Sequence, residues 1–166
     1  MKKIAVVAVL VMTLLSLGMA FAFENEPEGF RDLKWGDPPT EKIEGLIELA
    51  GRGKVYIRPS DKLYLGDAQL RTIWYSFYQD KFMRVSLYFK GKHNYDLLET
   101  ICRERYGEET TSELYKLYWL SGQTSVDLSY DFTEDEGALS LADWELLQEW
   151  KDVVDKELKT KRKSTK

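Results

Sequence analysis

The sequence predicts an α+β domain in which an antiparallel sheet carries helices packed on one face. Two observations favour this class. Several short segments rich in aromatic and β-branched residues alternate between apolar and polar positions, as strands with one buried side do. Other segments repeat apolar residues at helical spacing. The predicted order is helix, three strands, helix, three strands, helix, which indicates two α-β-β-β units followed by a C-terminal helix.

The first predicted unit starts from a segment rich in turn residues. Residues 30–35 are predicted to form a short strand, which a glycine and two prolines at 36–39 end. Thr40 suits a helix N-cap, and apolar residues recur after it at helical spacing, so we expect a helix over 41–50. Its apolar stripe consists of Ile43, Leu46, Ile47 and Ala50. A short strand is expected at 55–57, before Pro59.

A hairpin at 73–89 is the clearest strand pattern in the chain. Two segments, 73–78 and 82–89, flank the polar turn residues 79–81. Alternation along the second segment predicts which side chains face the core. The predicted core set is Met83, Val85, Leu87 and Phe89. The predicted outer set is Phe82, Arg84, Ser86 and Tyr88, joined from the first strand by Trp74, Ser76 and Tyr78.

The second predicted unit begins with a helix that Asn94 caps and Gly107 ends. A second hairpin follows, with strands at 114–120 and 124–132. A short strand near 138–142 and a final helix from about Trp144 to Lys161 complete the chain. The apolar stripe of the helix after Asn94 consists of Leu97, Leu98, Ile101 and Cys102.

The chain opens with two lysines, an apolar run and a small-residue cleavage pattern at 20–22, so residues 1–22 are predicted to be a signal peptide. We therefore expect a protein of the periplasm or one that is secreted, without a stable membrane anchor after cleavage. Residues 23–150 are expected to form a single α+β domain, and 151–166 the basic, partly frayed end of the C-terminal helix. The single cysteine excludes an intramolecular disulfide.

Charge is unevenly distributed along the expected mature chain. Residues 23–150 carry 25 acidic and 15 basic side chains, whereas residues 151–166 carry seven basic and three acidic ones. An acidic body repels the phosphate backbone, so we expect no nucleic-acid partner.

The sequence offers little catalytic chemistry. His93 is the only histidine and is expected at a helix start, and Cys102 lies on an apolar stripe, which is typical of a buried structural thiol. We therefore expect no catalytic residue, metal site or cofactor, and we expect the protein not to be an enzyme. An alternative hypothesis is a hydrolase that uses Asp127 and Asp131, two carboxylates on one face of a predicted strand.

The predicted binding residues are aromatic and basic side chains of the outer sheet face: Trp74, Tyr78, Arg84, Tyr88 and Tyr118. Flat rings beside an arginine are typical of protein contact surfaces and of sugar platforms. One interpretation is that the last helix covers this face and makes it a second core. The other is that the face stays open and binds a protein or, alternatively, a small ligand or carbohydrate.

The stretch Gly29–Gly36, GFRDLKWG, resembles the opening GFRG-x-x-WG of a group of small exported bacterial proteins with no assigned activity. The likeness continues through the hairpin at 73–90 and the helix end at Tyr106 and Gly107, and this sequence differs in having Asp32 where glycine is frequent. The resemblance implies export and this fold. The arrangement is also similar to β-lactamase-inhibitor-like and outer-membrane-assembly lipoprotein folds, which bind other proteins, so a protein of the cell envelope is the expected partner.

Overall fold

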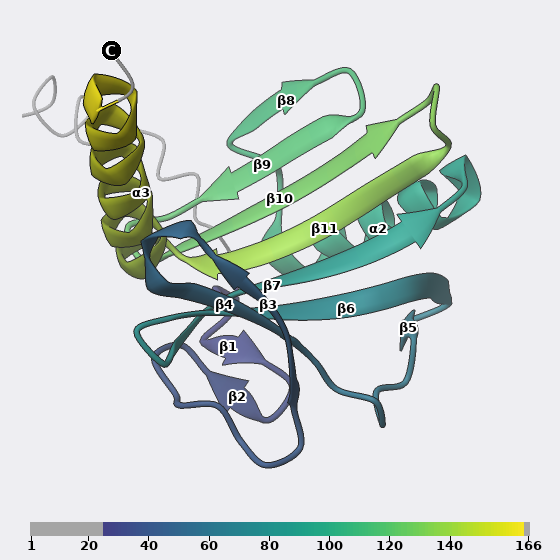
Figure 1. Ribbon diagram of the computed structural model, residues 1–166. Coiled ribbons are helices and arrows are strands. Elements are labelled where there is room, and N and C mark those ends of the chain that lie inside the picture. Colours follow the sequence, from purple (N-terminus) through teal and green to yellow (C-terminus); the bar gives the residue numbers. More distant parts are fainter. Residues whose placement is uncertain (1–24, 165–166) are drawn as a thin grey trace, which may run out of the picture.

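The computed structural model describes residues 25–164 and confirms an α+β fold built on a large antiparallel sheet (Figure 1). The signal peptide predicted at 1–22 lies outside these residues. Within residues 25–164, neither helix has the length and apolar character needed to cross a membrane.

The sheet contains nine strands, and a separate pair of strands precedes it. The strands are β1 Gly29–Phe30, β2 Leu33–Lys34, β3 Glu44–Leu49, β4 Gly53–Ile57, β5 Tyr64–Leu65, β6 Ala68–Tyr78, β7 Lys81–Lys90, β8 Thr111–Glu113, β9 Lys116–Leu120, β10 Thr124–Asp131 and β11 Glu136–Asp143. The helices are α2 Lys92–Tyr106 and α3 Trp144–Ser164, with a 3-10 turn, η1, at Ala50–Arg52. The strand order β3-β4-β6-β7-β11-β10-β9-β8 joins the two halves of the chain where β7 pairs with β11.

The predicted hairpin is formed by β6 and β7, but a β-bulge shifts the faces of two residues. Phe77 pairs with Phe82 while Ser76 pairs with Arg84, so Met83 is an extra residue in β7. Phe82 therefore points into the main core, as Val85 and Leu87 do. Met83 points to the opposite face. The prediction was wrong for these two residues because strict alternation does not allow for a bulge.

The helix predicted over 41–50 is wrong. Residues 44–49 form β3, which pairs with β4 and is followed by the 3-10 turn η1. Gly45 would lie inside the predicted helix, where glycine costs about 1 kcal/mol relative to alanine. Pairing with β4 satisfies the backbone of the segment instead, and the first predicted α-β-β-β unit therefore lacks its helix.

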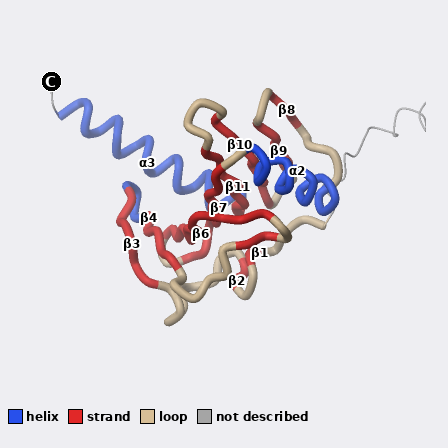
Figure 2. Tube along the Cα trace, turned by 90° about the vertical axis from the view of Figure 1, so that its right-hand side faces the viewer, coloured by secondary structure: helices blue, strands red, loops and turns tan. Residues whose placement is uncertain are grey.

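The two helices lie on opposite sides of the sheet, as Figure 2 shows, and not on one face as predicted. α2 packs on the main core through Tyr95, Leu98, Cys102 and Tyr106. α3 packs on the other side, where its Leu147 joins a smaller apolar cluster. The sheet residues of that cluster are Tyr78, Met83 and Ala142. Each helix thus buries its own apolar stripe against a different face.

Residues 30–35, predicted as one strand, form the small hairpin of β1 and β2 on the main-core side of the sheet. The Trp35 ring stacks on Phe82 with centroids 4.9 Å apart, and its Nε1 donates to the Pro27 carbonyl at 2.7 Å. Gly36, at φ 82°, donates its N–H to the Phe82 carbonyl at 2.9 Å. The GFRDLKWG stretch therefore has a structural task, which is to attach the N-terminal hairpin to the main core.

Candidate functional site

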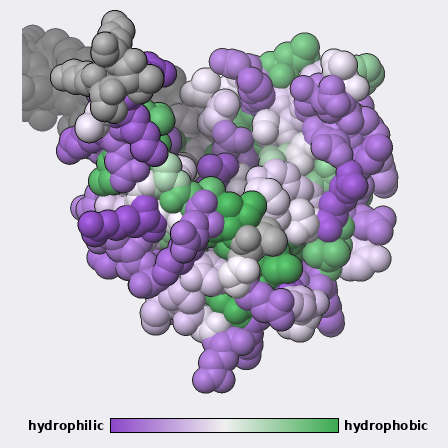
Figure 3. Space-filling view, in the orientation of Figure 1, coloured by the Kyte–Doolittle hydropathy of each residue, from purple (hydrophilic) through white to green (hydrophobic). Residues whose placement is uncertain are grey.

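The sheet face opposite α2, which we call the open face, is covered by α3 at one end. There α3 buries the apolar cluster around Met83. Figure 3 views the molecule from this side, where pale and hydrophobic (green) residues lie in the middle and hydrophilic side chains gather to the left and right. The side chains that form the uncovered part are Thr72, Trp74, Arg84, Ser86, Tyr88, Lys116, Tyr118, Asp127, Ser129, Ala138 and Ser140.

Strand register arranges these residues in rows that run across the sheet. One row contains Trp74, Ser86, Ser140, Asp127 and Tyr118 in that order. A second row contains Thr72, Tyr88, Ala138, Ser129 and Lys116. Side chains that follow one another in a row are about 5 Å apart at Cβ. The register therefore brings aromatic residues from both hairpins, far apart in the sequence, onto one continuous surface.

Trp74 and Tyr88 form the aromatic end of the open face. They are diagonal neighbours on β6 and β7, and their rings meet in an edge arrangement with centroids 4.8 Å apart and planes at 61°. Both rings are half-buried, and neither belongs to the apolar cluster under α3. The pair is therefore held by its own contact and by the sheet beneath it, and it keeps a surface towards solvent.

Arg84 lies in the middle of the open face, above a pair of buried serines. Its Nη2 donates to Ser140 Oγ at 2.8 Å, and the hydroxyls of Ser86 and Ser140 are 3.1 Å apart. Both serines are buried, since the larger side chains around them fill the space above the sheet. Arg84 forms no ion pair with any residue of the range 25–164. Its guanidinium is thus held by a serine hydroxyl and not by a carboxylate of this part of the chain.

A groove of about 440 Å³ lies beside Arg84, between the start of α3 and strands β9 and β10. Asp127 stands in this groove, half-buried, and accepts no hydrogen bond from the described part of the chain. Burial raises the pKa of its carboxyl, although Arg84 and Lys116 act in the opposite direction. The other prominent lining side chains are Tyr118, Ser125, Trp144 and Lys151.

The structure brings together four of the five predicted binding residues. Trp74, Arg84, Tyr88 and Tyr118 share the open face. Tyr78 lies on the same sheet face but at the end that α3 covers, where it is 4% exposed. Its hydroxyl accepts a hydrogen bond from Gln79. The last helix therefore covers one end of the predicted face, which becomes a second apolar cluster, and leaves the rest of the face uncovered.

Ser140, Trp144 and Lys151 are among the residues of this surface that the sequence did not predict. Ser140 joins it because β11 lies between β7 and β10, a strand order that no local pattern indicates. Trp144 and Lys151 line the groove because α3 docks there, and Lys151 Nζ lies 5.6 Å from the centre of the Trp144 ring. Alternation within the predicted strand 138–142 would have placed Ser140 on its polar side.

The two carboxylates of the hydrolase hypothesis lie in different environments. Asp127 is half-buried in the groove, whereas Asp131 is exposed and accepts hydrogen bonds from the Thr133 and Glu134 amides at 2.8 and 3.2 Å. Asp131 thus stabilises the turn between β10 and β11. Over residues 25–164 no group of three or more His, Cys, Asp or Glu side chains is arranged to hold a metal ion.

The cysteine prediction is confirmed. Cys102 is fully buried in the main core, where burial raises the pKa of its thiol to about 12, so it stays neutral and unreactive near neutral pH. His93 is exposed in the first turn of α2.

No protein-family model matches the chain, and no curated protein or solved structure is similar enough to it to count as a match. The resemblance of GFRDLKWG to exported proteins therefore stays a prediction.

Proposed function

We propose that this chain is an exported, non-catalytic interaction module of the cell envelope, which binds another envelope protein through its open face. One observation carries the proposal: the Trp74–Tyr88 pair and the unpaired Arg84 lie side by side on a sheet face that α3 leaves uncovered. These are the three residue types most enriched among the side chains that dominate protein–protein binding energy.

The chemistry of the open face favours a protein partner with an acidic group among apolar side chains. The rings of Trp74 and Tyr88 are already fixed against each other, so binding costs little further side-chain entropy. Arg84 is held in place by Ser140 and offers its remaining N–H groups to a carboxylate in a two-point contact. The groove beside it accepts one protruding side chain of the partner.

Affinity capture with matched variants tests this function. The tagged mature chain is incubated with an envelope extract of its own organism, in parallel with the double variant Trp74→Ala/Tyr88→Ala and with Tyr64→Ala. Tyr64 is 58% exposed in β5, away from the open face, and serves as the control. The captured protein is then purified and titrated against all three forms.

We expect the double variant to bind at least about tenfold more weakly than the wild type, and Tyr64→Ala to bind equally well. Circular dichroism of each variant establishes that it is folded. Equal affinity of a folded double variant would overturn the open face as the contact surface.

Export belongs to the same proposal and has its own test. The two N-terminal lysines, the apolar run and the cleavage pattern at 20–22 support it. N-terminal sequencing of the protein recovered from fractionated cells is expected to begin at Phe23, in the periplasmic or extracellular fraction. Recovery of the uncleaved chain in the cytoplasm would contradict it.

The groove supports a second candidate function, the binding of a carbohydrate or another small polar ligand. Tyr118, Trp144 and Asp127 all line it, and a sugar uses such a combination of rings and a carboxylate for stacking and for hydroxyl donation. A glycan array separates the two candidates. Binding of a defined glycan that Asp127→Asn and Trp144→Ala both abolish would favour this second function.

A further inference from the structure

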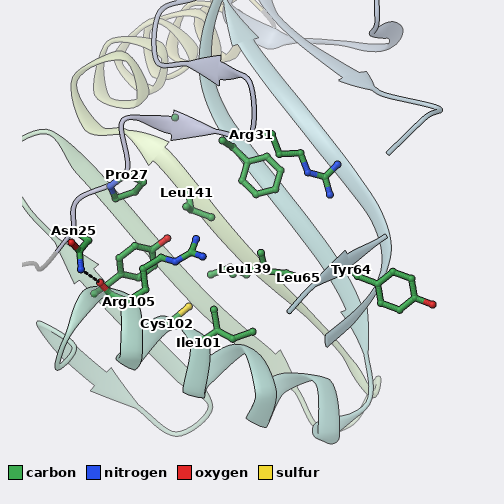
Figure 4. A pocket seen from close by; sticks show the side chains of 13 residues that line it. Asn25, Pro27, Arg31, Tyr64, Leu65, Ile101, Cys102, Arg105, Leu139 and Leu141 are labelled. Carbon is green, nitrogen blue, oxygen red and sulfur yellow. Dashed lines mark hydrogen bonds between the residues drawn. The ribbon is translucent and has the colours of Figure 1, made fainter. Parts of the chain in front are cut away.

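A second concave site lies on the other side of the sheet, between α2 and the N-terminal hairpin. It is a pocket of about 560 Å³, within the range of small-molecule sites. Figure 4 shows Leu139 and Leu141 of β11 beneath it, with Ile101 and Cys102 projecting from α2. It has no residue in common with the groove on the open face.

The floor of this pocket is apolar and preformed. Leu139, Leu141 and Cys102 are at most 4% exposed and belong to the main core, so they are fixed by packing on their other sides. Phe30 and Leu65 supply half-buried apolar walls. Binding an apolar ligand group here would remove apolar surface from water, which is favourable, and the floor would not have to rearrange.

A close approach of two segments fixes one wall of the pocket. Gly66, at φ 56°, lies so near α2 that a Cβ at this position would come within 2.8 Å of Ile101 Cδ1. The turn between β5 and β6 is therefore held against α2, and Leu65 and Ile101 line the pocket from adjoining segments. This close approach leaves no room for a side chain at position 66.

The mouth of the pocket carries two arginines with different partners. Arg31 is already paired with the Asp61 carboxylate and the Lys62 carbonyl. Arg105 reaches from α2 toward the middle of the pocket (Figure 4), and it forms no ion pair with any residue of the range 25–164. Its only described side-chain hydrogen bond is to the neutral Tyr106. A guanidinium without a counter-ion at an apolar pocket favours an anion joined to an apolar body.

We propose that this pocket binds a medium-chain fatty acid, with the carboxylate on Arg105 and the alkyl chain along Phe30, Leu139 and Leu141. A phosphate or sulfate ion would leave the apolar floor without a partner, and a neutral alkane would leave Arg105 without one. A fatty acid matches both parts of the site. Cys102 contributes to the floor as an apolar group only.

Titration of the mature chain with dodecanoate, below its micelle concentration, tests this proposal by calorimetry. We expect saturable one-to-one binding that Arg105→Gln weakens about tenfold, since one charge-assisted contact is lost. Dodecanol, which has the same chain without the charge, should bind the wild type about tenfold more weakly as well. Arg162→Gln removes an exposed arginine of α3 and is the matched control, expected to bind like the wild type.

Two further variants each place a larger side chain in the pocket. Leu141→Trp fills the floor and Ile101→Trp fills the half-buried wall, and whichever is folded should lose dodecanoate binding. Methyl NMR signals of Leu139 and Ile101 should shift on binding in the wild type, while the indole signal of Trp74 stays unchanged. Absence of saturable binding, or binding that both Arg105→Gln and a folded filling variant leave intact, would overturn the proposal. The Trp74→Ala/Tyr88→Ala variant should bind dodecanoate normally, so this site and the open face fail independently.

Discussion

The rings of Trp74 and Tyr88 meet edge to face, with centroids 4.8 Å apart, on the part of the sheet that α3 does not cover. The pair comes from adjacent strands, and Trp74 lies opposite the buried Ser86 in the strand register. Its environment differs from that of Phe82, which is fully buried on the opposite side of the same hairpin. Because Trp74 is half-buried and Phe82 is fully buried, we expect their replacement by alanine to destabilise the fold to different extents.

Trp74→Ala should lower the free energy of unfolding by about 1–2 kcal/mol, because the ring is half-buried and leaves no internal cavity. Phe82→Ala, in the main core, should cost about 3–5 kcal/mol. Urea denaturation of the two variants measures both values. A loss for Trp74→Ala as large as that for Phe82→Ala would mean that the open face is a second core.

Gly51→Ala should weaken the docking of α3. The residue has φ 67°, and an added Cβ would come within 2.8 Å of Val154 Cγ2 on α3. We expect a loss of about 2 kcal/mol and faster amide hydrogen exchange in α3 than in α2. Gly122→Ala is the control, since a Cβ there meets nothing within 4 Å. Equal exchange in the helices of the Gly51 variant and the wild type would show that this contact does not hold α3.

Asp32→Asn should remove part of the acid sensitivity of the fold. The hydrogen bond from Arg58, at 2.5 Å, lowers the pKa of Asp32 below 3.8, so its stabilisation is present above that pH and is lost as the pH falls through the folded-state pKa. The Asp32 side chain is half exposed, so the loss at neutral pH is about 1 kcal/mol. Melting curves at pH 7 and at pH values below 3.8 measure the effect.

Asp67→Asn is the matched control for Asp32→Asn. Asp67 is exposed and forms no ion pair with any residue of the range 25–164. It should melt like the wild type at each pH. If Asp32→Asn kept the full pH dependence of the wild type, the pair with Arg58 would not be the cause.

Asp127→Asn should raise the stability of the fold at neutral pH, unlike Asp32→Asn. Burial raises the pKa of Asp127 above 3.8, so this group favours folding most below that pH and loses its contribution as the pH rises through the folded-state pKa. Asparagine carries no charge, so the variant does not lose stability in this pH range. It should therefore melt higher than the wild type at pH 7 and equally at pH values well below 3.8. A lower melting temperature at pH 7 would mean that the Asp127 charge stabilises the folded state.

The sequence predicted the strands whose side chains alternate in a regular way, and it failed where contacts between distant segments decide the structure. Val126, Leu128 and Tyr130 alternate with polar neighbours in the predicted strand 124–132, and they face the main core. The 41–50 segment has the apolar spacing of a helix, but pairing with β4 makes its second half a strand. The bulge at Met83 depends on how β6 and β7 pair, which alternation does not encode.

The same distinction applies to the open face. Trp74, Arg84 and Tyr88 were identified together because one hairpin holds them and its register is local. Tyr78 lies on the predicted face, but its burial could not be predicted, since it depends on where α3 docks, about 70 residues later in the chain. The Arg105 pocket was not predicted at all, because it joins α2, β11 and the N-terminal hairpin.

Site-specific photo-crosslinking in the producing cells tests the open face most directly. A benzoylphenylalanine is placed at Tyr118 on the open face and, separately, at the exposed Tyr64 in β5. We predict one crosslinked envelope protein from Tyr118 and not from Tyr64, which disappears when Arg84→Ala and Trp74→Ala are added to a chain that remains folded. A crosslink from Tyr118 that persists in this folded variant, or the same product from Tyr64, would contradict the open face as the binding surface.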